Sequence, residues 1–285
     1  MDVTAPRTTI TRALRDVGAT ILNFLRDVGG SSIMLAGVFA RLRELPRTAR
    51  QTFLQMELIG IGSIPLVIVT SVFVGAVAAV QAAYQFQDYV PMVFLGTVVG
   101  KSVILELGPV LTALVVGGRV SASIAAELGT MKVTEQIDAM EVLAIDPLRY
   151  LVMPRVVACV VMLPVLTIFA DFLAILGGMF VANASVGVDY ATFVEGLRLF
   201  FYVDDVISGV IKAATFGGII GLMGCYNGFR TFGGAQGVGR ATMQAVVSSC
   251  ICILITNYFL ASVLLPRSQA ELEALEKGLV EGGVT

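Results

Sequence analysis

Five long apolar segments, joined by shorter polar stretches, constrain the fold of this chain more than any other feature of its sequence. The segments cover roughly residues 58–83, 92–118, 151–183, 206–227 and 243–265. Each is long enough to span, since a helix of roughly 20 mainly apolar residues crosses a bilayer. Charged residues make up only 14% of the chain, whereas soluble domains carry about a quarter. The sequence therefore predicts an all-α integral membrane protein with five transmembrane helices.

The residues before the first apolar segment predict helices that lie in the membrane interface. Apolar residues that recur at steps of four and three, on one helical face, are Ile10, Leu14, Val17, Ile21, Phe24 and Val28. The sequence GGSS at residues 29–32 is expected to interrupt this helix. The apolar run IMLAGVFARL that follows is too short to span a bilayer. We therefore expect residues 10–45 to lie in the interface; an ordinary soluble helix pair is the alternative.

Lys and Arg residues outside the spans are distributed unequally, and this predicts the orientation of the chain. Fourteen of them lie before the first span or in the connections that follow spans two and four. The other side is expected to hold only Arg198, Lys212, Arg267 and Lys277. Because positively charged loops stay in the cytoplasm, we expect a cytoplasmic N-terminus and a C-terminus on the opposite side.

The stretch GTMKVTEQIDAMEVLAIDPLRYL, residues 129–151, is unusually polar for a connection between two spans. Thr134 is a candidate N-cap, and acidic residues in a first turn suit a helix N-terminus. The apolar and acidic residues segregate to opposite sides of this helix, with Ile137, Met140 and Ala144 against Glu135, Asp138 and Glu141. Asp146-Pro147 disfavours continuation of the helix. The pattern favours a short cytoplasmic helix that docks on another protein, rather than a solvated loop.

The predicted spans contain the charged residues Lys101, Glu106 and Asp171. A charge in the bilayer centre costs about 2.5–3.5 kcal/mol on insertion scales, so such residues usually face a partner or water. Lys101 and Glu106 lie about 140° apart around a helix, so they need not pair with each other. Pro109 should kink the same helix. Two interpretations of Lys101 and Glu106 stay open: they line a polar part of a substrate path, or they hold helices together.

The sequence shows no recognisable motif for catalysis or nucleotide binding. Histidine, the commonest general base and metal ligand, is absent. The four cysteines lie in apolar runs and are expected to be buried hydrophobes. GTVVGKS at residues 96–102 resembles a phosphate-binding loop, but only three residues separate Gly96 from Gly100, where the motif has four. If ATP drives this protein, a separate subunit must bind it.

Glycines recur at steps of four, three and four in the fourth apolar segment, at Gly217, Gly221, Gly224 and Gly228. This spacing predicts that the helix packs closely against its neighbours, since small residues let helix backbones approach. The sequence shows no internal repeat, which weighs against a secondary transporter built from inverted repeats.

One long tract of the chain resembles a known family. The sequence ELGPVLTALVVGGRVSASIAAELGTMKVTEQIDAMEVLAIDPLRYLVMPR, residues 106–155, is similar to the signature region of the MlaE family, also called the YrbE family. YNGF at 226–229 and GVGRAT at 237–242 carry the resemblance further, so that it covers about residues 50–265. Members of this family are permease subunits of ABC transporters associated with MCE-domain lipid-binding proteins.

The resemblance implies an interfacial N-terminal helix, five spans and a homodimer that forms a lipid cavity. It makes residues 131–145 a coupling helix that docks in a groove of a cytoplasmic ATPase. By this match the coupling helix carries Thr134, Glu135, Gln136, Asp138, Met140 and Glu141. Glu106, with Pro109 one turn later, matches an acidic position near the lipid cavity. Members often carry a basic residue just before that acid; here the position is Leu105, and Lys101 is the candidate substitute.

We therefore expect three regions: an interfacial region at 1–50, a five-span permease domain at 51–265 and a polar, non-cytoplasmic tail at 266–285. The expected function is that of a permease subunit moving phospholipid or a related lipid, in a bacterial inner membrane. The resemblance implies as partners a second copy of the chain, an ABC ATPase that binds ATP, a STAS-domain subunit and an MCE-domain protein. No cofactor on this chain, no metal and no nucleic acid are expected.

Two other functions remain as alternatives. One is an ion-coupled secondary transporter that uses Lys101, Glu106 and Asp171. The other is a membrane-bound enzyme acting on lipids, although the sequence shows neither clustered carboxylates nor a nucleophile motif.

Overall fold

The computed structural model describes residues 26–86, 90–199 and 202–282, and these ranges contain helices and connections but no strand. The helix over residues 26–41 is followed by η1 (Leu42–Thr48), α2 (Ala49–Phe86), α3 (Phe94–Ser102), η3 (Val103–Leu107), α4 (Gly108–Val133), α5 (Gln136–Val142), η4 (Leu148–Val152), α6 (Met153–Val181), η5 (Ala182–Val186), α7 (Tyr190–Leu199), α8 (Val203–Phe229) and α9 (Gly234–Gly282). Of the short elements, η1 is a 3₁₀-helix and η3, η4 and η5 are π-helical turns. The predicted all-α fold class is confirmed.

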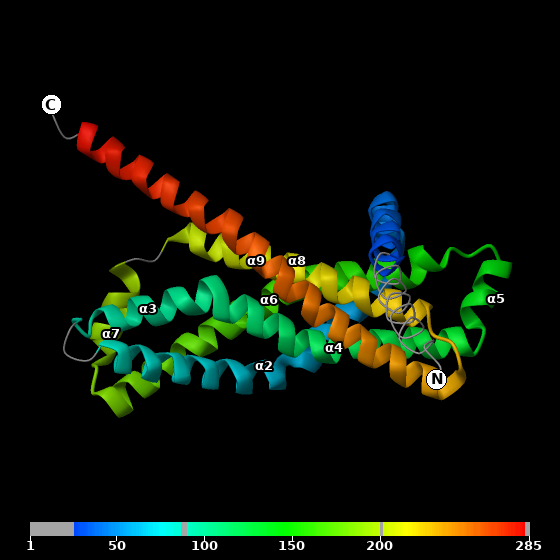
Figure 1. The fold of residues 1–285 in the computed structure, drawn as a ribbon, viewed down its shortest axis with the longest axis horizontal. Coiled ribbons are helices and arrows are strands. Elements are labelled where there is room, and N and C mark those ends of the chain that lie inside the picture. Colours follow the sequence, from blue (N-terminus) through cyan, green and yellow to red (C-terminus); the bar gives the residue numbers. More distant parts are fainter. Residues whose placement is uncertain (1–25, 87–89, 200–201, 283–285) are drawn as a thin grey trace, which may run out of the picture.

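Five helical runs in these ranges are long and apolar enough to cross a membrane. They are Arg26–Phe86, Phe94–Val133, Leu148–Val186, Val203–Phe229 and Gly234–Leu264. The five predicted spans match these runs one by one, with overhangs of at most two residues, so their number and order are confirmed. Figure 1 shows the long helices running side by side along the long axis of the molecule, with α5 at one end and α3 and α7 at the other.

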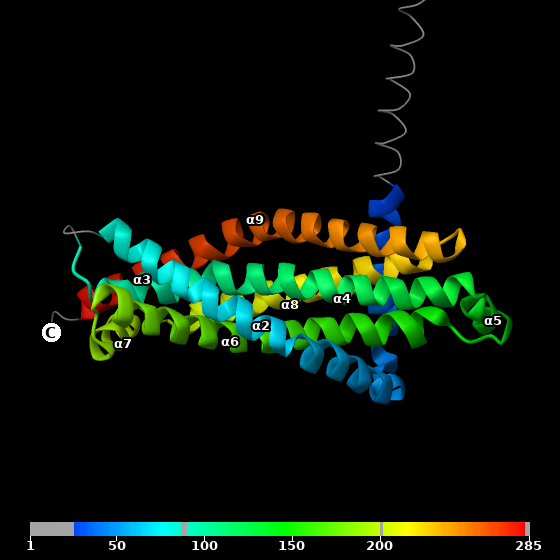
Figure 2. The ribbon, with the colours of Figure 1, turned by 90° about the horizontal axis from the view of Figure 1, so that it is seen from below.

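The helix over residues 26–41 runs across the long axis of the bundle in both ribbon views (Figures 1 and 2), as a helix in the membrane plane would. The expected interruption at residues 29–32 is wrong, because the helix is continuous there. The hydroxyl groups of Ser31 and Ser32 donate to the Val28 carbonyl, which satisfies them within the helix. Residues 1–25 of the predicted amphipathic helix lie outside the described ranges, and interfacial placement stays a prediction.

Glycines bring the spanning helices into backbone contact. A Cβ added to Gly75 of α2 would lie 1.8 Å from the Ala174 carbonyl oxygen of α6. On α8, Gly217 and Gly221 face α6, and Gly224 and Gly228 face α4. Any larger residue at these positions would push two helices apart. The predicted close packing of the fourth span is therefore confirmed. The first two of these glycines contact one neighbouring helix, and the next two contact another.

The segment resembling a phosphate-binding loop is part of a helix. Residues 96–102 lie in α3, and a Cβ on Gly96 would lie 2.1 Å from the Phe193 carbonyl oxygen of α7. Gly100 similarly packs against the Leu197 side chain. These two glycines therefore serve contact between α3 and α7, and their backbone is engaged in a helix rather than in an open loop.

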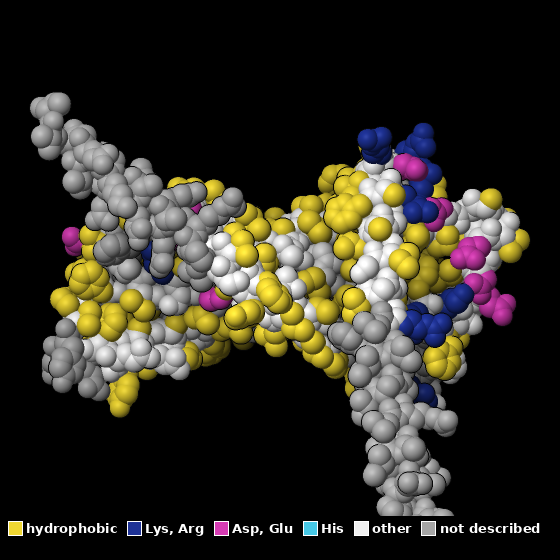
Figure 3. Space-filling model, turned by 45° about the horizontal axis from the view of Figure 1, so that its top comes forward, with side chains coloured by type: hydrophobic (Ala, Val, Ile, Leu, Met, Phe, Trp, Pro, Cys, Tyr) yellow, Lys and Arg dark blue, Asp and Glu magenta, His cyan; other side chains and the backbone are white. Residues whose placement is uncertain are grey.

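Apolar and charged side chains occupy different zones of the surface. Figure 3 shows hydrophobic side chains over the waist of the molecule, and acidic and basic side chains gathered mainly at the end that carries α5. Large exposed hydrophobic residues of the long helices include Phe53, Leu58, Ile61, Phe73, Phe172 and Met243. A bilayer around these helices would remove such side chains from water.

Candidate functional site

The polar connection between the second and third spans forms a short projecting helix. α4 ends at Val133, and α5 covers Gln136–Val142 before the chain turns back toward α6. Glu135, between the two helices, adopts a left-handed backbone conformation with φ 59°. Figure 1 shows α5 at the extreme end of the molecule, beyond the helix over residues 26–41, which we call the transverse helix. The predicted helix therefore exists, but it is shorter than residues 131–145.

Two local expectations for this helix are wrong. Thr134 is not an N-cap: its hydroxyl donates to the Thr130 carbonyl, so that it terminates α4 instead of starting α5. The apolar stripe is also incomplete. Ile137 is buried and Met140 is half-buried, but Ala144 is exposed beyond the end of α5. The left-handed conformations of Glu135 and Ala144 bend the chain at both ends, which helical periodicity does not anticipate.

The outward face of α5 carries acidic and apolar residues together. Glu135, Gln136, Asp138 and Glu141 are all exposed, as predicted for the acidic side. The sequence analysis missed the two most exposed apolar residues: Val142 is 87% exposed and Leu143 is 70% exposed. Their signal was present as a hydrophobic pair directly after the acids. This combination of apolar and acidic side chains is suited to contact with a protein groove that has a basic rim.

Ion pairs hold α5 and its return loop in place. Lys132 at the end of α4 lies 2.5 Å from the Asp138 carboxylate. Asp146, in the return loop, pairs with Arg41 of the transverse helix and accepts a 3.0 Å hydrogen bond from the Leu148 amide. These contacts join the loop to both its own span and the transverse helix.

Two further pairs anchor the third span. Arg149 lies 2.9 Å from Glu44 of η1. Arg155, buried near the start of α6, lies 2.8 Å from Glu127 of α4. The start of the third span is therefore held by ion pairs to both η1 and α4.

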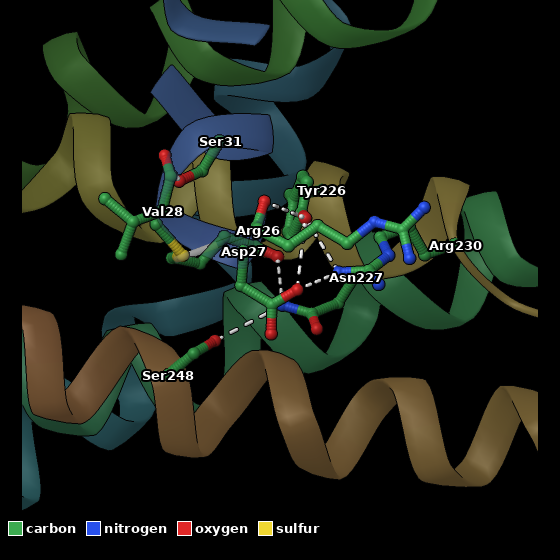
Figure 4. A network of polar contacts seen from close by, with 9 residues as sticks. Arg26, Asp27, Val28, Ser31, Tyr226, Asn227, Arg230 and Ser248 are labelled. Atoms are coloured by element: carbon green, nitrogen blue, oxygen red, sulfur yellow. Dashed lines mark hydrogen bonds and ion pairs between the residues drawn. The ribbon is translucent and has the colours of Figure 1, made fainter. Parts of the chain in front are cut away.

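A second polar network joins the transverse helix to the end of α8 (Figure 4). Arg230 donates to Asp27 and to the Tyr226 hydroxyl, the latter at 2.7 Å. The Tyr226 hydroxyl also lies 3.3 Å from the Asp27 carboxylate. The hydrogen bond with Asp27 raises the pKa of Arg230, so the guanidinium stays charged. Asn227 donates to the Ser248 hydroxyl of α9 at 3.2 Å, which extends the network to a third helix.

Glycine makes room for this network. A Cβ on Gly30 would lie 2.6 Å from the Tyr226 hydroxyl oxygen, so only glycine lets the transverse helix rest on this ring. The glycine that was expected to break the helix is a contact point instead.

Glu106 forms an ion pair that the sequence analysis did not foresee. Its carboxylate lies 2.8 Å from the Lys212 ammonium of α8, which also donates to the Leu105 carbonyl at 3.0 Å. The Lys212 side chain is 3% exposed, and the Glu106 side chain is 41% exposed. The expected assignment of Lys212 to a loop is therefore wrong, since it lies within a span. Lys212, rather than Lys101, supplies the positive charge beside Glu106.

Lys101 of α3 pairs with a different residue of α8. Its ammonium lies 3.5 Å from the buried Asp205 carboxylate and 5.1 Å from the centre of the Tyr202 ring. Asp205 and Lys212 are seven residues apart, and so lie on one face of α8. Between them, a Cβ on Gly209 would lie 2.7 Å from the Ile104 carbonyl oxygen. Two ion pairs and one glycine contact therefore fix α8 against the junction of α3 and η3.

The backbone is irregular at Glu106. Residues Val103–Leu107 form a π-helical turn directly before Gly108 and Pro109. Proline lacks the amide hydrogen that an α-helix requires, and π-turns are frequent at functional sites. The π-turn therefore interrupts the regular α-helix directly before Gly108, whereas the kink expected at Pro109 stays a prediction.

The three charged residues singled out from the sequence, Lys101, Glu106 and Asp171, do not form one site. Lys101 and Glu106 pair with different residues of α8, and Asp171 of α6 makes no ion pair with any described residue. Asp171 instead packs against Gly108, where a Cβ would lie 1.6 Å from its carboxylate oxygen. A single ion-coupling cluster of these three residues therefore has no support in the geometry. The described residues also contain no group of three or more His, Cys, Asp or Glu side chains placed to hold a metal ion.

Comparisons with known proteins agree on one family. The family described as Permease MlaE matches residues 52–263. The chain is 40% identical, over 87% of its length and 95% of the relative's, to a probable ABC transporter permease protein of Rickettsia conorii. It is 30% identical, over the same shares, to the intermembrane phospholipid transport system permease protein MlaE of Haemophilus influenzae.

A plant protein is also similar to this chain. The chain is 36% identical, over 75% of its length and 61% of the relative's, to the chloroplastic protein TRIGALACTOSYLDIACYLGLYCEROL 1 of Arabidopsis thaliana. The match to residues 52–263 covers the four long helical spans from α3 onward and most of α2. This chain is a multi-pass membrane protein that belongs to the MlaE family of ABC transporter permeases.

Proposed function

We propose that this chain is the membrane-spanning subunit of an ATP-driven transporter that moves phospholipid between a bacterial inner membrane and an MCE-domain protein outside it. The single observation that carries the proposal is the projecting helix α5, because it displays exposed apolar and acidic residues at the end of a rigid span. The name of the Haemophilus relative, an intermembrane phospholipid transport permease, supports the lipid substrate. In this proposal the N-terminus and α5 lie in the cytoplasm.

The ATPase is expected to bind α5. Val142 and Leu143 would enter a groove of that subunit, and burial of such side chains contributes about 1.5–3 kcal/mol each. Glu135, Asp138 and Glu141 would face basic residues on the rim, which favours correct orientation more than affinity. ATP would be bound and hydrolysed by that subunit, so this chain itself is expected to be no enzyme.

The conformational change would pass along α4. This helix runs without interruption from Gly108 to Val133, a length of about 39 Å. A shift of α5 on ATP binding would therefore move the far end of α4, where the π-turn and Glu106 lie. A homodimer would place two copies of this region around a shared lipid cavity, and its closure would expel lipid. A STAS-domain subunit and the MCE-domain protein complete the proposed assembly.

The test is co-purification of the ATPase of the same transporter with the full-length chain. Replacing both Val142 and Leu143 with serine should abolish co-purification and lipid-dependent ATP hydrolysis, because the docking surface loses its apolar part. Glu135→Lys with Glu141→Lys should weaken binding in a salt-dependent manner. The matched control is Glu195→Lys, on exposed α7 at the opposite end of the molecule, which should bind normally. Undiminished binding by both α5 variants would refute the proposed role of this helix.

A further inference from the structure

An open apolar groove lies at the bend where η1 leads into α2. Its volume is about 620 Å³. Its lining includes Arg50, Phe53, Leu54, Glu57, Ile61 and Met162. Phe53 is 69% exposed and belongs to the surface that a bilayer would cover. The groove therefore offers an acyl-chain-sized apolar surface that begins at a charged residue and continues along α2.

Three arginines have no protein partner among the described residues: Arg50, which lines the groove, and Arg43 and Arg47 of η1, the element that directly precedes α2. Arg43, Arg47 and Arg50 are all exposed, and none forms an ion pair or a hydrogen bond through its side chain with that part of the chain. Arg41, by contrast, is neutralised by Asp146. Figure 3 shows basic side chains gathered at this end of the molecule.

We propose that Arg43, Arg47, Arg50 and the adjoining groove, together named the elbow site, bind one anionic phospholipid from the leaflet on the α5 side. Arg47 and Arg50 bind the headgroup, and Phe53, together with its apolar neighbours in the groove, contacts an acyl chain. The site lies on the outer surface of α2 and is separate from the Glu106 region, so it does not depend on which lipid is transported.

Charge complementarity decides between a lipid and a protein occupant. The elbow site contains three arginines and one acid, Glu57, so it has a net positive charge. An apolar helix from another protein would cover the groove but leave the guanidinium groups without acceptors. An anionic lipid supplies both an acyl chain and phosphate oxygens, and arginine binds phosphate through several parallel hydrogen bonds. Basic residues near a membrane surface attract anionic lipid by about fivefold per residue.

The absence of tryptophan from the chain makes a direct test possible. Phe53→Trp places a single fluorescent reporter in the groove, and the matched control Phe73→Trp places one on the exposed surface of the same helix, about 30 Å further along. Each full-length variant is reconstituted in dioleoylphosphatidylcholine vesicles. Graded fractions of brominated dioleoylphosphatidylglycerol or brominated dioleoylphosphatidylcholine are then added, and quenching gives the relative binding constant of the two lipids.

At the Phe53→Trp reporter, the binding constant for the phosphatidylglycerol should exceed that for the phosphatidylcholine by at least about fivefold. Adding Arg47→Gln and Arg50→Gln should abolish this preference, whereas Arg47→Lys with Arg50→Lys should retain most of it. Glu57→Gln should leave the preference unchanged or increase it, since a negative charge is removed.

Two results would overturn the proposal. Equal quenching by the two lipids at Phe53→Trp would show that the arginines select no anionic headgroup. If neither brominated lipid quenches Phe53→Trp while both quench Phe73→Trp, protein covers the groove.

Discussion

The ion pair between Glu106 and Lys212 leads to an asymmetric prediction. Each partner can be neutralised with little change of shape, by Glu106→Gln and by Lys212→Met. The two variants leave different charges behind. Glu106→Gln leaves the ammonium of Lys212, 3% exposed, with only the Leu105 carbonyl and a neutral amide beside it. Lys212→Met leaves the Glu106 carboxylate, which is 41% exposed.

The magnitudes follow from these exposures. Removing one partner of a fully buried pair destabilises a protein by about 3–5 kcal/mol, because the other charge stays buried. Glu106 is partly exposed, so the pair is partly screened, and we expect about 2–3 kcal/mol for Glu106→Gln. For Lys212→Met we expect about 1 kcal/mol, since the remaining carboxylate is 41% exposed and methionine fills the vacated space.

The assay is equilibrium unfolding of the purified chain in nonionic detergent micelles with increasing dodecyl sulfate. The double variant Glu106→Gln with Lys212→Met should be close to Lys212→Met alone, which gives a coupling energy between the two positions. Arg240→Gln, an exposed arginine in α9 without an ion pair among the described residues, is the control and should change stability by less than about 0.5 kcal/mol. The reasoning fails if Lys212→Met is the more destabilising variant, or if Glu106→Gln behaves like the control.

Two further predictions concern the packing of the helices. Gly75→Ala should destabilise the chain by about 1–3 kcal/mol, because its Cβ would lie 1.8 Å from a backbone oxygen of α6; Gly118→Ala, with no atom within 4 Å of its Cβ, should be tolerated in the same unfolding assay. Arg230→Gln should speed amide hydrogen exchange in the helix over residues 26–41, because Asp27 of that helix loses its ion pair with Arg230, while exchange in α5 stays unchanged; equal exchange of the helix in the variant and in the unaltered chain would contradict the proposed anchoring.

The large-scale fold was predictable because the bilayer imposes a length on every spanning helix. The five apolar segments needed no knowledge of tertiary contacts, and neither did the close packing through Gly217 and Gly221. Local details failed where tertiary contacts override local preference. Thr134 is a good N-cap residue by type, but it ends α4 instead, and its hydroxyl donates back to the Thr130 carbonyl. Gly30 weakens a helix by propensity, yet the helix persists because glycine alone fits against Tyr226.

The partner of Glu106 could not be deduced from local spacing, since 106 residues separate it from Lys212. The sequence analysis counted Lys212 as a loop residue and so did not consider it as a partner, although its spacing on the helix indicated one. Asp205, Gly209 and Lys212 recur at steps of four and three in an otherwise apolar segment, which places two opposite charges and a glycine on one face. Charges on a spanning helix need partners, and a glycine between them allows close approach of a neighbouring backbone. Such a face predicts a second helix with the complementary charges, and Lys101 and Glu106, one on either side of Ile104, supply them.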